Sequence, residues 1–577
     1  MKYLKLVLIV WLAAVSTAPA FVPMTTGGNQ QRWELVNLPM SVHTNVVNRN
    51  TRAIRYYLGA NGYSAGNTAA ELNAIRASFA QWQAISGTVL KFEEAGLMNA
   101  ADVNTTDNSN VVYWATSTLV GNNLNISGTL GVTYSSFSMS GVFLQADIVL
   151  NGAENDWYTD FSSNSTTHFF AEGVLLHEIG HYIGLHHSPV GAASMLWVGG
   201  EGIQGQVGLA DDDVSGARLI YAQTNQLKNL GALTGSVTRN GSTIFGAAVF
   251  LEDTNGNLVA GTVTDSSGVY RLLAVQPESY QVRVCPLDPN SGDFLVRGSE
   301  ISSAYNAADT SFLPTANIAV NVPAGTNTLN LTVLSGTAPF RITDIRSPTA
   351  NPNSYRWSGT PITMWQGQSN FTVGVVSATL PTSGATLSVA GTGVSVGATT
   401  FNANLSGTGL NFMSVVLSVA SNAAPGPRTF IVQQGTNRAY ANGFIEIAPV
   451  APDYNFDSFD DTFQRKYFPL FTVANAASTA DPDGDGFPNS SEYLAGTNPT
   501  NATSLMKIDL VQHTVNGANV TFRSVSGKRY QLYSRALAET GAWQAVGAPV
   551  TAAGANTVAS DTSGGTGSKF YRVAIAP

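Results

Sequence analysis

The sequence predicts a multidomain chain in which an α+β domain comes first, all-β sandwich domains follow, and a short acidic loop module lies before the last domain. The chain has 577 residues, which corresponds to roughly four domains. A helix-like run rich in histidine lies at 177–187. Beyond residue 230, short alternating apolar runs are separated by Gly, Asn and Pro, a pattern typical of β-sandwiches.

Residues 1–20 have the features of a signal peptide. Lys2 and Lys5 precede an apolar run over 6–15, and the small residues at 18–20 supply a cleavage site. The run is too short to span a membrane, and no later segment reaches about 18 consecutive apolar residues. We therefore expect a secreted or cell-surface protein without a membrane span.

The histidine run lies within the first domain, residues 21–223, and matches the pattern HExxHxxGxxH at each specified position. Two histidines four residues apart share one face of a helix, so His177 and His181 can bind one zinc ion. On a continued helix His187 would be rotated by about 240° from His181 and carried about 9 Å along the axis. The chain must therefore turn, and Gly184 can do so because glycine reaches positive φ without steric cost.

Three histidine ligands leave one coordination position of zinc open for water. Glu178 follows the first ligand, so we expect it to act as general base on that water and not as a ligand. Other candidates for the third ligand are His186, Glu201 and the acidic run at 211–213. The register of the motif favours His187.

The surroundings of the motif resemble the matrixins, a family of metzincin zinc proteases. Ser188 is typical of that family, and Ser194-Met195 looks like its Met-turn. The segment 209–221, which contains Asp212 and Asp213, resembles its closing helix. Upstream similarities occur at Arg32-Trp33, Phe79–Trp82 and Leu90–Phe92. The resemblance implies a twisted five-stranded sheet with long helices, one catalytic zinc in a cleft, and protein or peptide substrates.

Two departures from the family are visible. Only His43 and His168 precede the motif, so we predict no second, structural zinc, and the single cysteine, Cys285, lies too far downstream to act as a prodomain latch. A lone cysteine in an exported chain is most simply a small buried apolar residue. Cleavage after residue 20 would make Phe21 the new N-terminus. In the matrixins the ammonium group of an equivalent phenylalanine pairs with an aspartate of the closing helix, so the resemblance implies that Phe21 pairs with Asp212 or Asp213.

The segments after the protease-like domain are predicted to be β-rich. Residues 224–335 resemble a carboxypeptidase-regulatory-like sandwich, with hairpin turns at Asn255-Gly256 and Ser267-Gly268. Residues 336–449 suggest an immunoglobulin-like sandwich, and 506–577 a small terminal β domain. The aromatics of that last domain, including Trp543, are expected more often in a core than on a sugar-binding platform.

Residues 450–505 contain a second motif, which matches the calcium loop DxDxDGx5E. Clustered carboxylates repel one another unless a cation neutralises them, and Ca²⁺ prefers six to eight oxygen ligands. The segment resembles thrombospondin type 3-like and EF-hand-like calcium repeats. The predicted calcium ligands are Asp481, Asp483, Asp485, the Phe487 carbonyl, Asn489 and Glu492.

Only 11% of the residues are charged and the formal net charge is −9. With no basic cluster, the sequence gives no support to nucleic-acid binding. The sequence therefore predicts a secreted zinc metalloendopeptidase with a structural calcium loop. The alternative is a surface adhesin or glycan-binding protein whose protease domain is silent or incidental.

Overall fold

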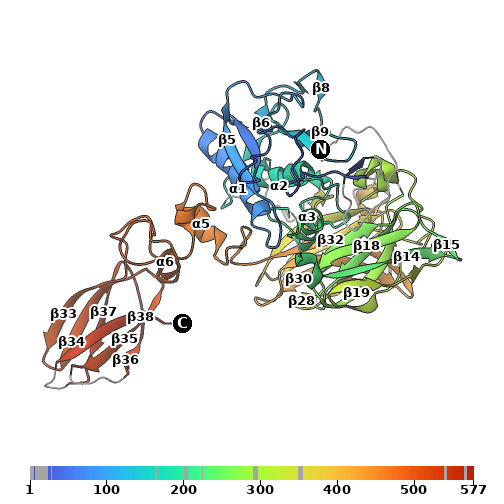
Figure 1. Ribbon diagram of the computed structural model, residues 1–577. Helices are drawn as coiled ribbons and strands as arrows, with labels where there is room; N and C mark the ends of the chain where they lie inside the picture. The colour runs from blue at the N-terminus through green and yellow to red at the C-terminus, as the bar shows by residue number, and fades with distance from the viewer. Residues whose placement is uncertain are drawn as a thin grey trace. The chain divides into compact units, whose positions relative to one another are not determined.

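The computed structural model describes residues 5–6, 24–26, 29–162, 165, 167–200, 206–223, 225–289, 296–348, 355–537, 542–564 and 568–576. The chain divides into two compact units, Met1–Phe456 and Asp457–Pro577. Each unit is described by itself below (Figure 1).

The first domain is built on a five-stranded sheet with the order β5-β4-β6-β10-β9, as the resemblance implied. Four strands run parallel, and the edge strand β9 pairs antiparallel with β10. The strands are β4 (Ile54–Gly59), β5 (Phe92–Met98), β6 (Val111–Ala115), β9 (Gly131–Phe137) and β10 (Phe143–Asn151).

Three helices belong to this domain: α1 (Thr68–Gln83), α2 (Ala171–Tyr182) and α3 (Asp211–Tyr221). α1 and α2 pack against each other, and two buried tryptophans fix α2 in place. The indole of Trp82 donates to Leu176 O at 3.0 Å, and that of Trp33 donates to Tyr182 O at 2.8 Å. Both indole N–H groups thus have hydrogen-bond partners on α2 inside the apolar core. These two bonds fix the position of α2 in the domain.

Short ribbons complete the domain. They pair β1 (Lys5–Leu6) with β13 (Val198–Gly199), β2 (Thr25–Thr26) with β3 (Asn29–Gln30), β7 (Leu119–Val120) with β8 (Leu124–Asn125), and β11 (Trp157–Tyr158) with β12 (Phe169–Phe170).

Within 224–335 the strands form two facing sheets around a shared apolar core. Gly256 has φ +89° in a hairpin turn between two paired antiparallel strands, as predicted. Gly268 has φ +75°, but its turn connects strands of different sheets, so the predicted hairpin at this position is wrong. One sheet contains β14 (Gly231–Arg239), β15 (Ser242–Thr243), β18 (Val269–Val275), β21 (Gly325–Thr328) and β22 (Leu331–Thr332). The other contains β16 (Ala247–Glu252), β17 (Leu258–Val263), β19 (Glu278–Pro286) and β20 (Ile318–Val322).

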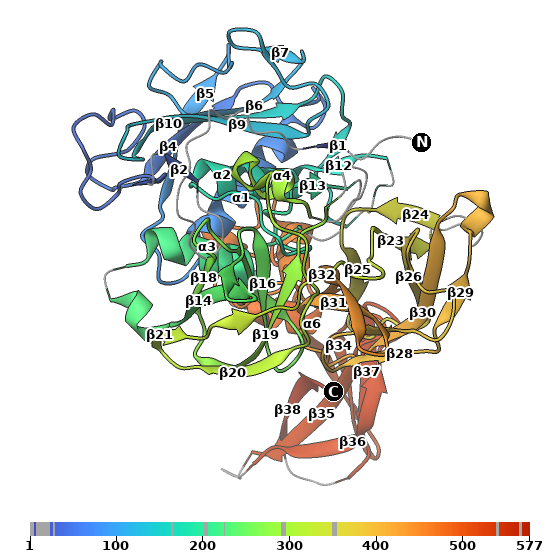
Figure 2. The same ribbon diagram turned by 90° about the vertical axis from the view of Figure 1, so that its right-hand side faces the viewer.

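Three short helices accompany this sandwich: η1 (Gln226–Asn229), α4 (Gly298–Ile301) and η2 (Ser303–Tyr305). α4 is a single turn in the connection between β19 and β20. Figure 2 shows it beside α2 of the first domain.

Within 336–449 two further sheets face each other. One contains β23 (Asp344–Pro348), β24 (Tyr355–Ser358), β26 (Phe371–Ser377), β28 (Val394–Val396), β29 (Thr400–Asn402) and β30 (Asn411–Val419), with η3 (Leu405–Gly407) beside it. The other contains β25 (Ile362–Trp365), β27 (Thr386–Val389), β31 (Gly426–Gln434) and β32 (Asn437–Ala448).

One apolar cluster joins these three parts of the first unit. It contains Val190, Leu196 and Trp197 from the segment after the histidine motif, together with residues of both sandwiches. Cys285 belongs to this cluster and is free and buried, as predicted. The segment that follows the histidine motif therefore shares a core with the β-rich part of the chain.

The second unit begins with α5 (Asp461–Tyr467), η4 (Ala474–Ala476) and α6 (Asn489–Ala495). Two three-stranded antiparallel sheets follow. They contain β33 (Ile508–Thr514), β34 (Gly517–Arg523) and β37 (Asn556–Asp561), and β35 (Arg529–Ala536), β36 (Gln544–Thr551) and β38 (Lys569–Ile575).

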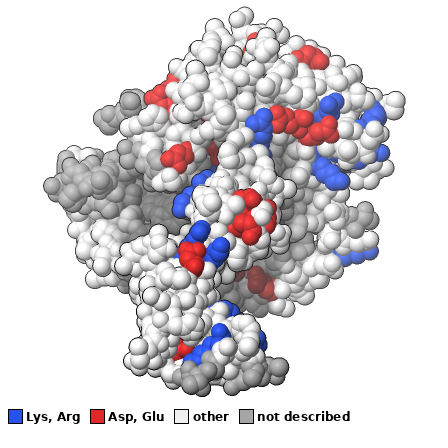
Figure 3. Space-filling view, turned by 90° about the vertical axis from the view of Figure 1, so that its left-hand side faces the viewer, with Lys and Arg blue, Asp and Glu red and all other residues white. Residues whose placement is uncertain are grey.

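Charged side chains are sparse on the face shown in Figure 3, where Lys and Arg occur in small separate groups. Among the described residues, no helix combines the length and apolar character needed to cross a bilayer.

Candidate active site

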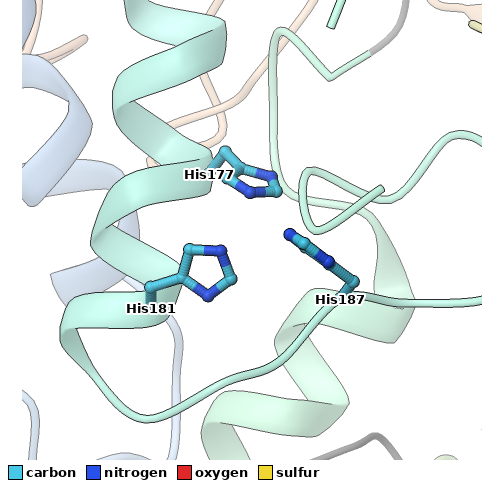
Figure 4. A group of neighbouring side chains, drawn as sticks. All are labelled: His177, His181 and His187. Carbon is cyan, nitrogen blue, oxygen red and sulfur yellow. The ribbon is translucent and has the colours of Figure 1, made fainter. Parts of the chain in front are cut away.

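Three imidazole rings converge at the end of α2. His177 and His181 project from the helix, and His187 comes from the chain that turns back toward them (Figure 4). The ring centroids are 4.6 to 5.2 Å apart, and one ligand atom from each residue lies within 4.8 Å of the others. The structure thus brings together the three histidines that the motif predicts as zinc ligands.

Gly184 makes this convergence sterically feasible. α2 ends at Tyr182, and Gly184 adopts φ +100° while its N–H donates to His181 O at 2.9 Å. A Cβ at this position would lie 2.2 Å from Gln31 O. Both the backbone conformation and the lack of space therefore require glycine.

Each ring nitrogen Nδ1 faces a backbone carbonyl. Because a carbonyl can only accept a hydrogen bond, each Nδ1 carries the proton and each Nε2 offers its lone pair. The acceptors are Ser194 O for His177 at 2.7 Å, Leu185 O for His181 at 2.7 Å, and Glu300 O for His187. Such outer partners fix the tautomer and the orientation of metal-binding histidines.

The three Nε2 atoms are buried and have no hydrogen-bond partner. Burial lowers the pKa of His177 to about 3 and that of His187 to about 4, and it lowers that of His181 well below its usual range. The rings are therefore neutral at physiological pH, which is the form that binds zinc. A zinc ion fits this donor set.

Glu178 lies on the same helix and is fully buried. The hydroxyl of Thr133 on β9 donates to Glu178 Oε2 at 2.7 Å, whereas Oε1 has no partner. Burial raises the pKa of Glu178 to about 8, although the hydrogen bond from Thr133 opposes this shift. One carboxylate oxygen is thus fixed and the other remains free.

Asp213 fixes the Met-turn. Its carboxylate accepts hydrogen bonds from Ser194 N at 2.7 Å, Met195 N at 3.2 Å and Ala210 N at 2.9 Å. Ser194 is also the residue whose carbonyl orients His177. Met195 is fully buried, and its sulfur fills the space beside Gly180, where a Cβ would lie 2.1 Å from Sδ.

Asp212 is buried beside the same segment. Its Oδ2 accepts from the hydroxyl of Ser188 at 2.6 Å, and its Oδ1 accepts from Gly261 N at 2.7 Å. Burial, followed by repulsion from Asp213, raises the pKa of Asp212 to about 8. The predicted partner Phe21 lies outside the described residues.

The other candidates for the third zinc ligand do not join the histidine group. His186 is buried but is not a member of it, and neither are the aspartates at 211–213. Glu201 lies outside the described residues. The motif favoured His187 as the third ligand, and His187 is the residue whose ring lies beside those of His177 and His181.

The predicted calcium loop also gathers its ligands. Carboxylate oxygens of Asp481, Asp483 and Asp485 lie within 4.8 Å of one another. Gly484 and Gly486 have φ of +74° and +92°, and Gly486 N donates to Asp481 Oδ2 at 3.0 Å. The chain therefore folds tightly around the three carboxylates.

Further predicted ligands lie at the start of α6. Asn489 Oδ1 and Glu492 Oε2 are buried without a partner, as are Asp483 Oδ2 and Asp485 Oδ2. Burial raises the pKa of Glu492 to about 7, and repulsion from the three aspartates adds to this shift. The gathered oxygens of Asp481, Asp483 and Asp485 fit a hard divalent cation, and Glu492 is not a member of that group. Phe487 N donates to Asp485 Oδ1 at 2.9 Å.

Comparison with known families identifies two of the domains. Residues 48–222 match the matrixin family, so the class of this domain is that of a zinc metalloprotease. Residues 232–287 match the carboxypeptidase regulatory-like domain. The chain therefore carries a matrixin domain followed by a carboxypeptidase regulatory-like domain and further β-rich domains.

Comparisons with curated proteins and with solved structures do not identify further domains. No curated protein matches the chain. Similar solved structures include BcpA, the major pilin subunit of Bacillus cereus, at 9% identity and TM-score 0.15, covering 60% of this chain and 87% of that one. The Bacillus anthracis TIE protein, at 8% identity and TM-score 0.13, covers 60% of this chain and 45% of its own.

Several residues at the site were not expected from the sequence. Thr133 contacts the candidate base from 45 positions upstream. Gly261 reaches the site from the segment that matches the carboxypeptidase regulatory-like domain, and Glu300 from the connection that follows it, 49 and 113 positions from their partners. A single Thr or Gly in a strand, or a single Glu in a one-turn helix, has no local pattern that distinguishes it, so only the three-dimensional arrangement reveals these contacts.

Proposed function

We propose that this protein is a secreted zinc-dependent endopeptidase that hydrolyses peptide bonds in extracellular proteins. The observation that supports it best is a set of four buried polar atoms without partners: Nε2 of His177, His181 and His187, and Oε1 of Glu178. Buried polar atoms without partners are costly. A metal ion and a water molecule would satisfy all four.

The proposed chemistry depends on how these side chains are held. His177, His181 and His187 would bind the ion, which supplies Lewis acidity toward a water molecule and the scissile carbonyl. Glu178 then takes a proton from the attacking water through its free Oε1 and returns it to the leaving amine. Thr133 keeps the carboxylate in one orientation during both transfers.

The test is digestion of casein or gelatin by the mature chain, with and without a chelator of zinc. Glu178→Gln keeps the size of the side chain but removes the base, so cleavage should fall by about 10²-fold or more while zinc binding persists. Equal cleavage by wild type and Glu178→Gln would contradict the proposal.

The second unit supports a second proposal, a calcium ion at residues 481–492. The carboxylates gathered there repel one another, and several of their oxygens lack partners. Ca²⁺ would neutralise this charge and connect the loop to α6. Its role would be structural, because the sequence contains one such loop and not the pair typical of sensors.

A surface in the same unit favours an additional binding function. On the sheet β36-β35-β38, Arg535 lies 5.1 Å from the ring of Trp543, and Arg572 lies 5.1 Å from Trp543 and from Tyr533. Phe570 lies on the same face and is 46% exposed. Tyr530, by contrast, is buried in the core, so the aromatics of this domain divide between core and surface.

Acidic polysaccharides suit this face, since aromatic rings stack on sugars and arginine pairs with carboxylates. Among the described residues neither Arg535 nor Arg572 has a carboxylate partner. The full chain should be retarded by polygalacturonate in affinity electrophoresis more than by a neutral glucan.

Trp543→Ala should weaken that binding by about 10-fold, as expected for a contact of about 1 to 2 kcal/mol. Trp365→Ala, which removes another partly exposed tryptophan of the first unit, is the control and should have no effect. Equal retardation by neutral and acidic polymers would exclude the arginine contribution.

A further inference from the structure

The third candidate zinc ligand differs from the other two in the origin of its outer partner. His177 and His181 donate to carbonyls of the matrixin domain itself, Ser194 and Leu185. His187 donates to the carbonyl of Glu300, which belongs to α4 of the neighbouring sandwich. The orientation of one ring therefore depends on a segment outside the matrixin domain.

Packing on both sides holds α4 at this place. Ile301 is fully buried in the cluster that also contains Trp197. The guanidinium of Arg297 lies 5.7 Å from the ring of Trp197 and pairs with Glu300. A Cβ on Gly298 would lie 2.0 Å from Tyr305 O, so the turn has no space to shift. The carbonyl of Glu300 is thus presented by a fixed element.

A second contact from the sandwich reaches the residue after His187. Gly261 N on β17 donates to Asp212, whose other oxygen accepts from Ser188. A Cβ on Gly261 would lie 2.8 Å from Val190 Cγ2, so strand and segment approach closely. The segment is also bound from the next domain, since Gly191 N donates to Asn442 O at 2.9 Å.

We infer that the carboxypeptidase regulatory-like sandwich is a positioning part of the zinc site, which orients His187 through the Glu300 carbonyl and holds Ser188 through Gly261 and Asp212. The inference rests on the proposed zinc site but not on cleavage of any substrate. Outer partners of metal-binding histidines contribute about 10- to 100-fold in metal affinity. The two contacts explain why the segment after the motif is buried among β-strands.

Linkage supplies a test in the wild-type full chain. If the contact with Glu300 strengthens zinc binding, zinc must strengthen that contact by the same factor. Hydrogen exchange of the amides at 297–305 should therefore slow when zinc is added to the chelated protein. The amides of β34 in the second unit serve as the control and should not change. Unchanged exchange at 297–305 would overturn the inference.

Two substitutions test the same coupling by changing the sandwich and measuring the zinc affinity. Gly298→Ala forces α4 to move, and Gly261→Ala pushes β17 away from Asp212. Each should weaken zinc by about 10-fold or more in a competition titration with a chromophoric chelator. Gly268→Ala places a Cβ 2.5 Å from Thr243 Cβ in the same sandwich, away from these contacts, and should leave the zinc affinity unchanged.

The outcomes separate this inference from the proposed protease. Wild-type zinc affinity in both variants, or an equal loss in Gly268→Ala, would overturn the positioning role. Higher casein cleavage by Gly298→Ala at unchanged zinc affinity would indicate that α4 covers the site. This result would also overturn the positioning role. Zinc coupling without cleavage of any protein would support the inference and contradict the protease.

Discussion

Glu178 and Thr133 show how one hydroxyl can oppose the effect of burial on the candidate base. The hydroxyl binds Oε2 of the carboxylate and also Glu178 O at 3.0 Å, so it touches both the side chain and the helix. Burial alone would favour a protonated, neutral Glu178, whereas the donated hydrogen bond favours the charged base.

Thr133→Val removes this hydrogen bond at nearly constant volume. A hydrogen bond to a charged group contributes about 1.5 to 3 kcal/mol, so kcat on a peptide substrate should fall by about 10-fold or more. The zinc affinity should stay the same, because Thr133 contacts no histidine of the trio. Steady-state kinetics and a zinc titration measure the two effects.

Thr129→Val is a matched control, because its buried hydroxyl donates to Ile126 O at 2.7 Å and does not contact Glu178. An equal fall in kcat for both variants would assign the effect to general loosening of this region.

Some residues of the site could be predicted from a short stretch of sequence, whereas others depend on contacts between distant segments. His177, His181, His187 and Gly184 could be predicted because the helix period and one turn fix their positions within eleven residues. Thr133 could not, since its contact depends on how β9 packs against α2. Asp212 and Asp213 were predicted near the site, and the structure adds which backbone N–H groups they accept from.

At the scale of elements, the end of α2 determines whether the third histidine reaches the site. Gly184→Ala would add a Cβ both at φ +100° and 2.2 Å from Gln31 O. The left-handed conformation alone costs about 1 to 2 kcal/mol for a non-glycine residue. We expect thermal unfolding at a lower temperature and weaker zinc binding.

Gly128→Ala separates the two causes, because Gly128 has φ +80° but no atom within 4 Å of the added Cβ. It should show the backbone cost without the clash, and it should keep the zinc affinity of wild type. Equal destabilisation by the two substitutions would mean that the backbone at Gln31 moves away from the added Cβ at little cost in free energy.

Elements with a repeating pattern were predicted better than isolated ones. The alternating runs beyond residue 230 indicated strands, and the turn glycine at 256 has the expected left-handed φ. α4 was not predicted, because a helix of one turn has no periodicity in the sequence. For the aromatics of the last domain the sequence favoured a core over a sugar-binding platform, and the structure divides them, with Tyr530 buried and Phe570 exposed.

At the scale of the whole molecule, the two compact units predict two separable responses to metals. Removing calcium should lower the unfolding temperature of the unit at 457–577. An ion present at 100 times its Kd stabilises a fold by about 2.7 kcal/mol, or several degrees for a domain of this size. Zinc affinity in the first unit should not change, and calorimetry with a zinc titration measures both.

Glu492→Gln should remove most of the calcium response, because it takes away a charged ligand. Asp509→Asn lies outside the loop in the same unit, where it breaks only an exposed ion pair with Arg523, and should keep the response. A calcium-dependent shift that survives Glu492→Gln would place the ion elsewhere.

Composition and length indicated several domains, but they could not indicate which parts of the chain share a core. The apolar cluster that joins Val190, Leu196 and Trp197 to the two sandwiches depends on contacts across more than 200 positions. Such contacts have no signature in a single sequence. The boundaries at 223, 335 and 449 remain predictions from the sequence.

The distance in sequence between His187 and Glu300 also sets an order of events during synthesis. A chain that leaves the ribosome or the export channel with its N-terminus first presents His177, His181 and His187 long before residue 300 emerges. The last ring acquires its partner only when the following sandwich has folded. A nascent chain would then hold the proposed zinc ion about 10- to 100-fold more weakly until this sandwich has folded.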